Sequence, residues 1–272
     1  MMRCVLAALA TILLIAALGL ITSEAQQREG AFFGPTVINL PSGAIPGARG
    51  IDFMLTHRFN EDIRKAGPSQ LFGLDGGSSV SYAARFGLTD RISFAVRRNA
   101  KHEPNKDNTI EISSSLQVLR QKQNAVTLQI NGGLGGTHNF GRHYSPFVQC
   151  VAVHTVKDRL SLLVAPTFAF NTTVNKTVAA ETANHTIALG IGAGIRMNKS
   201  TSVVGEYIPR LRGYKGAGAV HQAGMSFGLQ HATFRHVFEL VITKQTPTTV
   251  AQYAVGGGGL FRIGFNLYRK IK

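Results

Sequence analysis

The sequence predicts an all-β protein, an antiparallel transmembrane β-barrel of about 12 strands with short periplasmic turns and longer extracellular loops. Three observations lead to this prediction. Apolar and polar residues alternate in repeated segments, the gaps between these segments are alternately short and long, and an apolar N-terminal stretch precedes them. The composition agrees, because only 16% of the 272 residues are charged while 30 are Gly. A chain of this kind is not disordered, and it has no second apolar run long enough for a helical membrane protein.

Residues 1–25 have the features of a cleaved signal peptide. Arg3 precedes an apolar run over 5–21, and Ser23 and Ala25 are small residues at the two positions that a signal peptidase reads. An uncleaved anchor is the alternative, although this run is at the short limit for a spanning helix. The expected regions are a signal peptide over 1–25, a periplasmic N-terminal segment over 26–49 and the barrel over 50–272.

Alternation along the chain defines the expected strands. In the segment over 91–99, Ile, Phe and Val residues alternate with Ser, Ala and Arg residues. The segments over 109–118 and 124–133 repeat the pattern, and 259–269 shows it most regularly. Most segments are near the roughly 9–11 residues that cross a bilayer as a tilted strand. The expected strands are 50–58, 77–86, 91–99, 109–118, 124–133, 146–155, 159–169, 185–196, 201–208, 218–229, 235–244 and 259–269.

The connections between these strands are alternately short and long. This layout is typical of bacterial outer-membrane barrels, in which periplasmic turns are tight and extracellular loops are long. The short connections are 87–90, 119–123, 156–158, 197–200 and 230–234. The long ones are 59–76, 100–108, 134–145, 170–184, 209–217 and 245–258.

A soluble β-sandwich also alternates apolar and polar residues, and it is the alternative fold. The polar faces of the expected strands are rich in Ser, Gly, Gln and Thr and carry few charges, as a lumen would. Gly190, Gly192 and Gly194 recur on one face of one strand, a spacing that suits a crowded lumen better than a solvated surface. These observations favour the barrel.

Several stretches resemble a family of outer-membrane β-barrels from Gram-negative bacteria that is known only as a domain of unknown function. The more distinctive ones are 57–59 and, after a loop, 71–75, while 86–93 is a generic barrel turn. The resemblance implies a barrel of this size, without an established activity and without a catalytic or binding residue. One departure is the end of the chain, where 269–272 follow the aromatic residue on which such barrels commonly end.

If the apolar faces meet lipid, the charged and polar side chains of the strands face the lumen. Arginines outnumber acids among them, so an open lumen would mildly favour anions. The side chains that we expect to line a pore are Arg85, Arg91, Arg97, Glu111, Gln129, Arg196, Glu206, Glu239 and Arg262. Those expected at its constriction are Arg85, Arg97, Arg196 and Arg262.

The formal net charge of +15 raises the question of anionic partners. Basic loops suit the phosphates of lipopolysaccharide, and simple solvated loop charges are the alternative. Nucleic acid is not expected, because no aromatic–basic platform or binding motif accompanies the charge. We expect a monomer whose partners are outer-membrane lipid, lipopolysaccharide and, during insertion, the barrel-assembly machinery.

Metal, cofactor and catalytic sites are not expected. His138 and His143 share a loop, but no third ligand lies near them in the sequence. His154 and Ser161 lie across a short turn, without a nucleophile motif or a third group to orient them. An outer-membrane hydrolase is therefore the least favoured function, and we do not expect an enzyme.

A barrel of about 12 strands leaves only a narrow lumen. The favoured function is therefore a weakly selective pore for small solutes or ions in the outer membrane of a Gram-negative bacterium. The alternative is a closed barrel whose extracellular loops bind a ligand, a metal centre or a partner protein.

Overall fold

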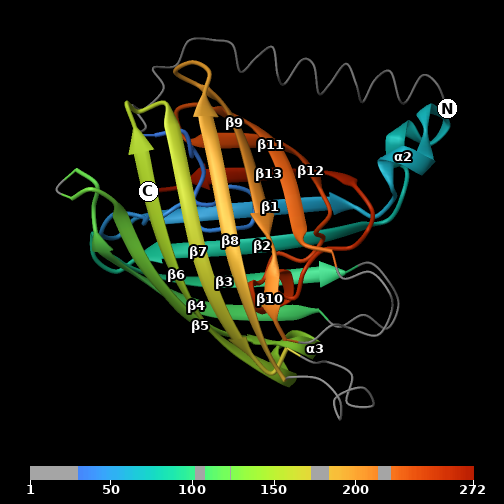
Figure 1. The fold of residues 1–272 in the computed structure, drawn as a ribbon, viewed down its shortest axis with the longest axis horizontal. Helices are drawn as coiled ribbons and strands as arrows, with labels where there is room; N and C mark the ends of the chain where they lie inside the picture. Colours follow the sequence, from blue (N-terminus) through green and yellow to red (C-terminus); the bar gives the residue numbers. More distant parts are fainter. Residues whose placement is uncertain (1–29, 102–107, 123, 173–183, 214–221) are drawn as a thin grey trace.

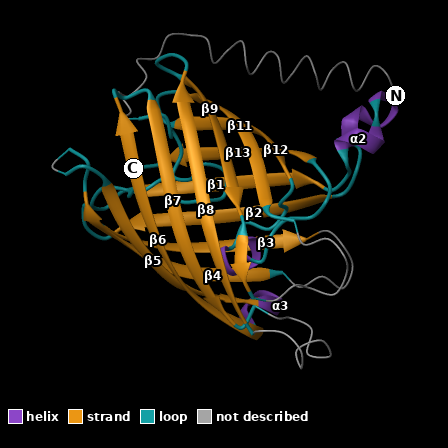
Figure 2. Ribbon diagram, viewed as in Figure 1, coloured by secondary structure: helices purple, strands orange, loops and turns teal. Residues whose placement is uncertain are grey.

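The computed structural model describes residues 30–101, 108–122, 124–172, 184–213 and 222–272. The predicted signal peptide lies outside these residues. Within them, the strands form one antiparallel sheet that closes on itself into a barrel (Figures 1 and 2). None of the described helices is long and apolar enough to cross a membrane.

The prediction of a closed antiparallel barrel of 12 strands is confirmed. The strands are β1 (Ile51–Phe59), β2 (Ser78–Gly87), β3 (Ile92–Lys101), β4 (Thr109–Leu119), β5 (Thr127–Gly136), β6 (Arg142–Val156), β7 (Leu160–Phe170), β8 (His185–Arg196), β9 (Thr201–Ile208), β10 (Arg210–Arg212), β11 (Gly224–Ala232), β12 (His236–Thr243) and β13 (Arg262–Lys270). The three-residue β10 follows β9 along the same neighbour, β8, and so adds no further position to the wall. The short helices are α2 (Ile63–Ala66), η1 (Pro68–Gly73), α3 (Thr137–Phe140) and α4 (Val250–Ala254).

Each strand pairs with its neighbours along the chain, and the first and last strands also pair. β1 pairs with both β2 and β13, while β9 pairs with both β8 and β11. A meander of this kind follows from the connections, because neighbouring antiparallel strands can be joined by a short turn. Closure leaves no strand edge whose amide and carbonyl groups would face lipid without a hydrogen-bond partner.

The expected long loop over 134–145 is wrong. β5 continues to Gly136 and β6 begins at Arg142, so only a tight connection separates them. The glycines at the end of β5 suggested a loop, but they pair in register with β6. The ladder overrides their low strand propensity, because both strands gain hydrogen bonds along their full length.

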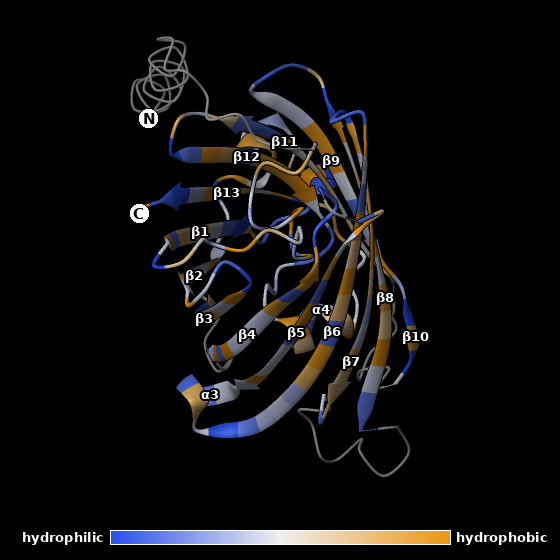
Figure 3. Ribbon diagram, turned by 90° about the vertical axis from the view of Figure 1, so that its left-hand side faces the viewer, coloured by the Kyte–Doolittle hydropathy of each residue, from blue (hydrophilic) through white to orange (hydrophobic). Residues whose placement is uncertain are grey.

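Apolar and polar residues alternate along the strands of the wall (Figure 3), which has an exposed apolar face and a buried inner face. In β12, Phe238 and Leu240 are 42% and 59% exposed, whereas Val237 and Glu239, which alternate with them, are at most 2% exposed. Outward apolar residues of this kind occur on strands all around the barrel. Such an outer face suits contact with lipid tails, and the polar residues between them are directed inward.

The N-terminal segment lies inside the barrel over residues 30–44, which differs from the periplasmic position expected for 26–49. Ala31, Val37 and Leu40 are 0% exposed. The apolar character of the segment explains the difference, because these side chains would meet water in the periplasm and are buried in the lumen.

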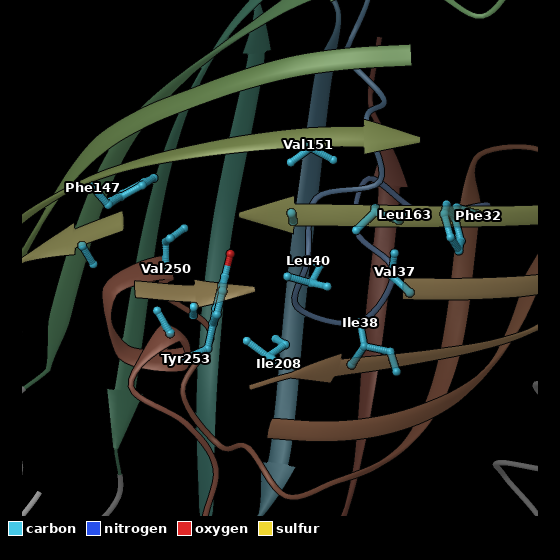
Figure 4. Close-up of a cluster of buried hydrophobic side chains, with 14 of the residues drawn as sticks. Phe32, Val37, Ile38, Leu40, Phe147, Val151, Leu163, Ile208, Val250 and Tyr253 are labelled. Atoms are coloured by element: carbon cyan, nitrogen blue, oxygen red, sulfur yellow. The ribbon is translucent and has the colours of Figure 1, made fainter. Parts of the chain in front are cut away.

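A hydrophobic cluster inside the lumen joins three parts of the chain (Figure 4). The N-terminal segment, the connection that carries α4 and the inner face of the wall each contribute to it. The labelled members are Phe32, Val37, Ile38, Leu40, Phe147, Val151, Leu163, Ile208, Val250 and Tyr253. The core of this barrel is therefore its filled lumen.

We predict that Gly133→Val destabilises the wall beside this cluster. A Cβ at residue 133 would lie 2.6 Å from the Ile112 carbonyl oxygen and 2.6 Å from Phe147 Cζ, so backbone or ring must move. Overpacking of this kind costs about 1–3 kcal/mol. The urea midpoint of unfolding, followed by the gel mobility of the unheated protein, should fall.

The matched control is Gly132→Val on the same strand. The nearest atom to a Cβ at residue 132 is the Phe147 carbonyl oxygen, at 3.9 Å, because this residue faces outward. Equal midpoints for the two variants would contradict the inward orientation of residue 133.

Candidate functional site in the barrel lumen

A short hairpin of the N-terminal segment, residues 34–42, occupies the lumen. The Ser42 amide donates to the Pro35 carbonyl oxygen at 3.0 Å, and the Val37 amide donates to that of Leu40 at 2.8 Å. These bonds form within the segment, which joins no strand of the wall. We call residues 34–42 the lumen hairpin.

The tip of the lumen hairpin is anchored by the carboxylate of Glu206 on β9. The amides of Ile38, Asn39 and Leu40 donate to Glu206 Oε2 at 3.3, 2.8 and 3.0 Å. Asn39 Nδ2 donates to Glu206 Oε1 at 2.6 Å. Successive amides that converge on one anion form a nest, and their charge-assisted hydrogen bonds are roughly twice as strong as neutral ones. The carboxylate therefore fixes the position of the tip.

The glycine stripe on β8 makes room for the side chains of the N-terminal segment. A Cβ at residue 190 would lie 2.6 Å from Leu40 Cδ2, and one at residue 194 would lie 2.8 Å from Phe32 Cε1. The spacing that indicated a crowded lumen in the sequence thus has a specific cause. Only glycine leaves enough space between the wall and this segment.

A second set of anchors lies nearer the short turns. Gln230 Oε1 accepts from the Phe33 amide at 2.9 Å. Tyr268 Oη lies 2.6 Å from Thr36 Oγ1 and donates to Glu239 Oε2 at 3.1 Å. The side chains of Gln230, Glu239 and Tyr268 are almost completely buried, so each needs a hydrogen-bond partner inside the protein. The N-terminal segment supplies some of these partners.

The connection between β12 and β13 fills the lumen from the long-loop end. The Val250 amide donates to Glu111 Oε2 at 2.6 Å, and Arg97 Nη1 donates to the Thr248 carbonyl oxygen at 2.9 Å. Both bonds attach this connection to inward-facing side chains of β3 and β4. The lumen is therefore filled from both ends.

The two filling segments meet in the middle of the lumen. Asn39 Nδ2, at the hairpin tip, also lies 3.4 Å from Gln245 Oε1 and donates to it. Beside this contact is a cavity of about 60 Å³, whose lining includes Arg85, Arg97 and Gln129. A polar cavity of this size holds a few water molecules. It is not a continuous path for a solute.

Most of the expected pore-lining side chains face the interior, where they contact the filling segments. Arg85 Nη2, for example, donates to the Ala44 carbonyl oxygen. The buried members of the set are Arg85, Glu111, Gln129, Glu206 and Glu239, and Arg97 lines the central cavity. Sequence alternation thus located inward-facing residues but not what they would contact.

The other three expected pore-lining arginines lie at the ends of the strands or in a turn, and Arg196 among them lies over the Phe33 ring of the N-terminal segment, 5.3 Å from its centroid. Arg91 is an exposed residue of the turn before β3, which begins at Ile92, so its predicted place in the lumen is wrong. The alternation of apolar and polar residues extends to residue 91, although the backbone of this residue already belongs to the turn. Arg196 ends β8 at the short-turn end and Arg262 begins β13 at the long-loop end. Arg196 and Arg262 are therefore at opposite ends of the barrel and do not share one constriction.

The described residues contain no group of three His, Cys, Asp or Glu side chains that could hold a metal ion. His154 and Ser161 point to opposite faces of the wall. Ser161 Oγ accepts from the Ala31 amide at 2.9 Å in the interior, whereas His154 is exposed outside, with Nδ1 2.7 Å from the Ala125 carbonyl oxygen. The pair considered for hydrolysis therefore does not meet.

At the long-loop end, Asp62 and Arg64 connect two loops. Arg64 Nη2 donates to Asp62 Oδ2 at 3.0 Å and to the Gly259 carbonyl oxygen at 3.0 Å. The hydrogen bonds from Arg64 lower the pKa of Asp62 from its ordinary value, so the carboxylate keeps its charge. This contact fixes α2 beside the connection that carries α4.

The lumen hairpin was not predicted from the sequence. The available signal was the presence of two apolar stretches, 31–33 and 37–40, directly before the first strand. An exposed linker gains nothing from such side chains. The glycine stripe on β8 was the matching signal in the wall.

A family model described as "Membrane bound beta barrel domain (DUF5777)" matches residues 32–271. The chain belongs to this family. The resemblance seen in the sequence is confirmed, and the matched region contains the lumen hairpin as well as the wall. The family is a domain of unknown function and assigns no activity. No curated protein sequence matches the chain.

Solved structures of similar fold include outer-membrane channels. A KdgM porin has a TM-score of 0.53 at 8% identity, over 82% of this chain and 99% of the other. A NanC porin gives 0.52 at 8% identity, over 82% and 99%. An outer membrane channel from Pseudomonas putida F1 gives 0.50 at 10% identity, over 84% and 97%. These similarities show the β-barrel fold, and the family description of a membrane-bound barrel supports a membrane location.

We predict that Glu206→Gln loosens the lumen hairpin. A neutral amide accepts more weakly than the carboxylate and presents an NH₂ group to the hairpin amides, and loss of charged hydrogen bonds costs about 1.5–3 kcal/mol. Val37→Cys, in a Cys150→Ser chain beginning at Gln26, serves as a buried reporter. Its maleimide labelling rate in the folded barrel should rise about tenfold or more.

The matched control is Glu111→Gln in the same reporter chain. Glu111 is also a buried carboxylate that accepts from a backbone amide, but that amide belongs to the other filling segment. Labelling at residue 37 should therefore stay near the parent rate. Equal rates for the Glu206→Gln and parent chains would contradict the anchoring role of Glu206.

Proposed function

We propose that the protein is an outer-membrane channel that its own lumen hairpin keeps closed. The observation that carries the proposal is that the wall is complete without the hairpin. All pairings around the ring are made by the strands, and the hairpin adds none. It can therefore leave the lumen without opening a single strand pair, whereas a structural strand could not.

The inner face of the wall supports the same proposal. Ser202, Gln230 and Asn266 are polar, and each currently bonds to the N-terminal segment. Departure of the segment would expose these groups to water, together with Glu206 and Glu239. A lumen so lined would conduct small hydrated solutes or ions with weak selectivity, and the connection that carries α4 would keep it narrow.

The direction of closure follows from where the segment enters. Gly30 lies beside the β6–β7 turn, and the Arg49 amide donates to Gly87 at the β2–β3 turn, so both ends of the segment are at the short-turn end. Short turns face the periplasm in bacterial outer-membrane barrels. We therefore place the hairpin as a plug on the periplasmic side of the barrel. In this proposal the barrel is a monomer without enzymatic activity, and residues 1–25 direct its export. Outer-membrane lipid, lipopolysaccharide and the assembly machinery are its partners in this proposal.

A permanently closed barrel is the second candidate, and the hydrophobic cluster in the lumen favours it. Side chains from both filling segments meet there, including Leu40, Val250 and Tyr253. In this case the function would lie at the long-loop end, where α2 and η1 are displayed. The two candidates differ in whether displacement of the hairpin opens a conducting path.

We predict that a disulfide between the wall and residue 43, directly after the lumen hairpin, silences conductance. A Cβ at residue 43 would lie 3.9 Å from Val153 Cβ, within the range of about 3.5–4.5 Å that disulfides need. Gly43→Cys with Val153→Cys, in the Cys150→Ser chain, should give transient steps in a planar bilayer when reduced. The oxidised protein should be silent, because its hairpin cannot leave.

The Gly43→Cys single variant is the control, since it carries the same backbone strain but forms no bridge. Its conductance should be the same under both redox conditions. A folded Glu206→Gln protein whose residue 37 labels rapidly but which never conducts would refute the channel and leave the closed barrel.

A further inference from the structure

A hollow of about 460 Å³ opens at the short-turn end, beside the N-terminal segment. Phe32, Phe33 and Pro35 form one side of it, and 44–47 contribute to the same side. The opposite side is made by residues at the short-turn ends of β1, β2, β12 and β13. We call this hollow the cationic vestibule. Its volume lies within the range of roughly 300–1,000 Å³ typical of ligand pockets.

The charges that line the cationic vestibule are nearly all positive. The cations among the lining residues are Arg85, Lys122, Arg235, Arg269 and Lys270, and Asp52 is the only acid among the described lining residues. Arg269 pairs with His236 and lies on the outward face of β13, so the other four cations face the hollow. Asp52 Oδ2 lies 3.7 Å from Arg85 Nη1 and offsets that one charge. Arg235 and Lys270 form no ion pair with any described residue. Such a grouping raises the local concentration of anions.

The floor of the vestibule is apolar. Phe33, Val237 and Tyr268 are each at most 5% exposed and line it together with Pro35. Rings and aliphatic groups beside cations bind a molecule that is charged at one end and apolar at the other. An inorganic ion would contact the cations but not the apolar floor.

A second hollow at the same end shows that the charge is local. It measures about 480 Å³ and lies against Ser42 and Gly43, on β4–β7. Its charged lining residues are one cation, Lys122, and one acid, Asp158. The accumulation of cations therefore belongs to the cationic vestibule and is not a property of the whole short-turn end.

We propose that the cationic vestibule binds a small organic anion, a phosphate or carboxylate that carries an apolar group. Because the N-terminal segment forms one side of the hollow, the site is complete only while that segment is seated. A bound anion therefore stabilises the filled lumen. This proposal goes beyond the channel function, and it holds whether or not the lumen ever conducts.

The first test is calorimetric titration of the folded chain beginning at Gln26, in a neutral detergent at low salt. Phenyl phosphate should bind at least tenfold more tightly than inorganic phosphate, which lacks the apolar group. Benzylammonium, which keeps the ring and reverses the charge, should not bind. Equal binding of phenyl phosphate and benzylammonium would overturn the proposal.

Variants locate the binding site. Arg235→Gln with Lys270→Gln removes two cations of the vestibule and should weaken phenyl phosphate binding by at least tenfold. Lys199→Gln, an exposed cation of the β8–β9 turn outside the vestibule, should leave the affinity unchanged. Unaltered affinity in the double variant, with the fold confirmed by heat modifiability, would refute the assignment.

The last test measures the link to the N-terminal segment. A ligand that binds only the seated form must lower the population of the displaced form. Saturating phenyl phosphate should therefore slow maleimide labelling of Val37→Cys at least threefold, and inorganic phosphate at the same concentration should not. Tight binding without slower labelling would show that the segment does not complete the site. Failure of the channel would instead appear as silent bilayers with binding and labelling as expected.

Discussion

Closure of the antiparallel ladder is the constraint on which the rest of this structure depends. Lipid offers no hydrogen bonds, so every amide and carbonyl group of the wall must find its partner in a neighbouring strand. The β1–β13 and β8–β9 pairings complete the ring and remove its edges. Once the ring is closed, the alternation along each strand decides which side chains face lipid and which face the lumen. The contents of the lumen are thus set strand by strand.

A closed ring of this size creates a second requirement. Its inner face is polar, so the polar groups there need hydrogen-bond partners when water is excluded. Glu206, Gln230 and Glu239 would each be costly to bury without partners. The N-terminal segment meets part of this requirement with backbone amides at its tip and apolar side chains along its flanks. Glycine in β8 accommodates those flanks, so the wall and the segment are complementary in both charge and shape.

Local patterns predicted the wall well, because a barrel strand is defined by alternation within a few residues. The expected bounds of 185–196 and 201–208 agree with β8 and β9, whereas the glycine-rich end of β5 and the start of β6 were misread as a loop. The candidate site was harder to predict from the sequence, because contacts such as Phe33 to Gln230 join residues 197 positions apart. The alternation of residues within a strand does not predict such a pairing. Alternation gave the direction of Glu206 but not the three amides that it would bind.

Buried charges on the inner face of the wall limit how firmly the lumen hairpin is held. Arg58 is completely buried, and its Nε and Nη2 atoms have no described hydrogen-bond partner. Glu206 and Glu239 are buried beside the N-terminal segment. Burial of a charge carries a large desolvation cost that its partners offset only in part. Water that enters when the hairpin leaves would hydrate these groups and so compensate for the exposure of Val37 and Leu40. A lumen filled only with apolar side chains would have no such compensation and would stay closed. The mixture of buried charge and apolar packing therefore supports the proposal that the hairpin is bound reversibly.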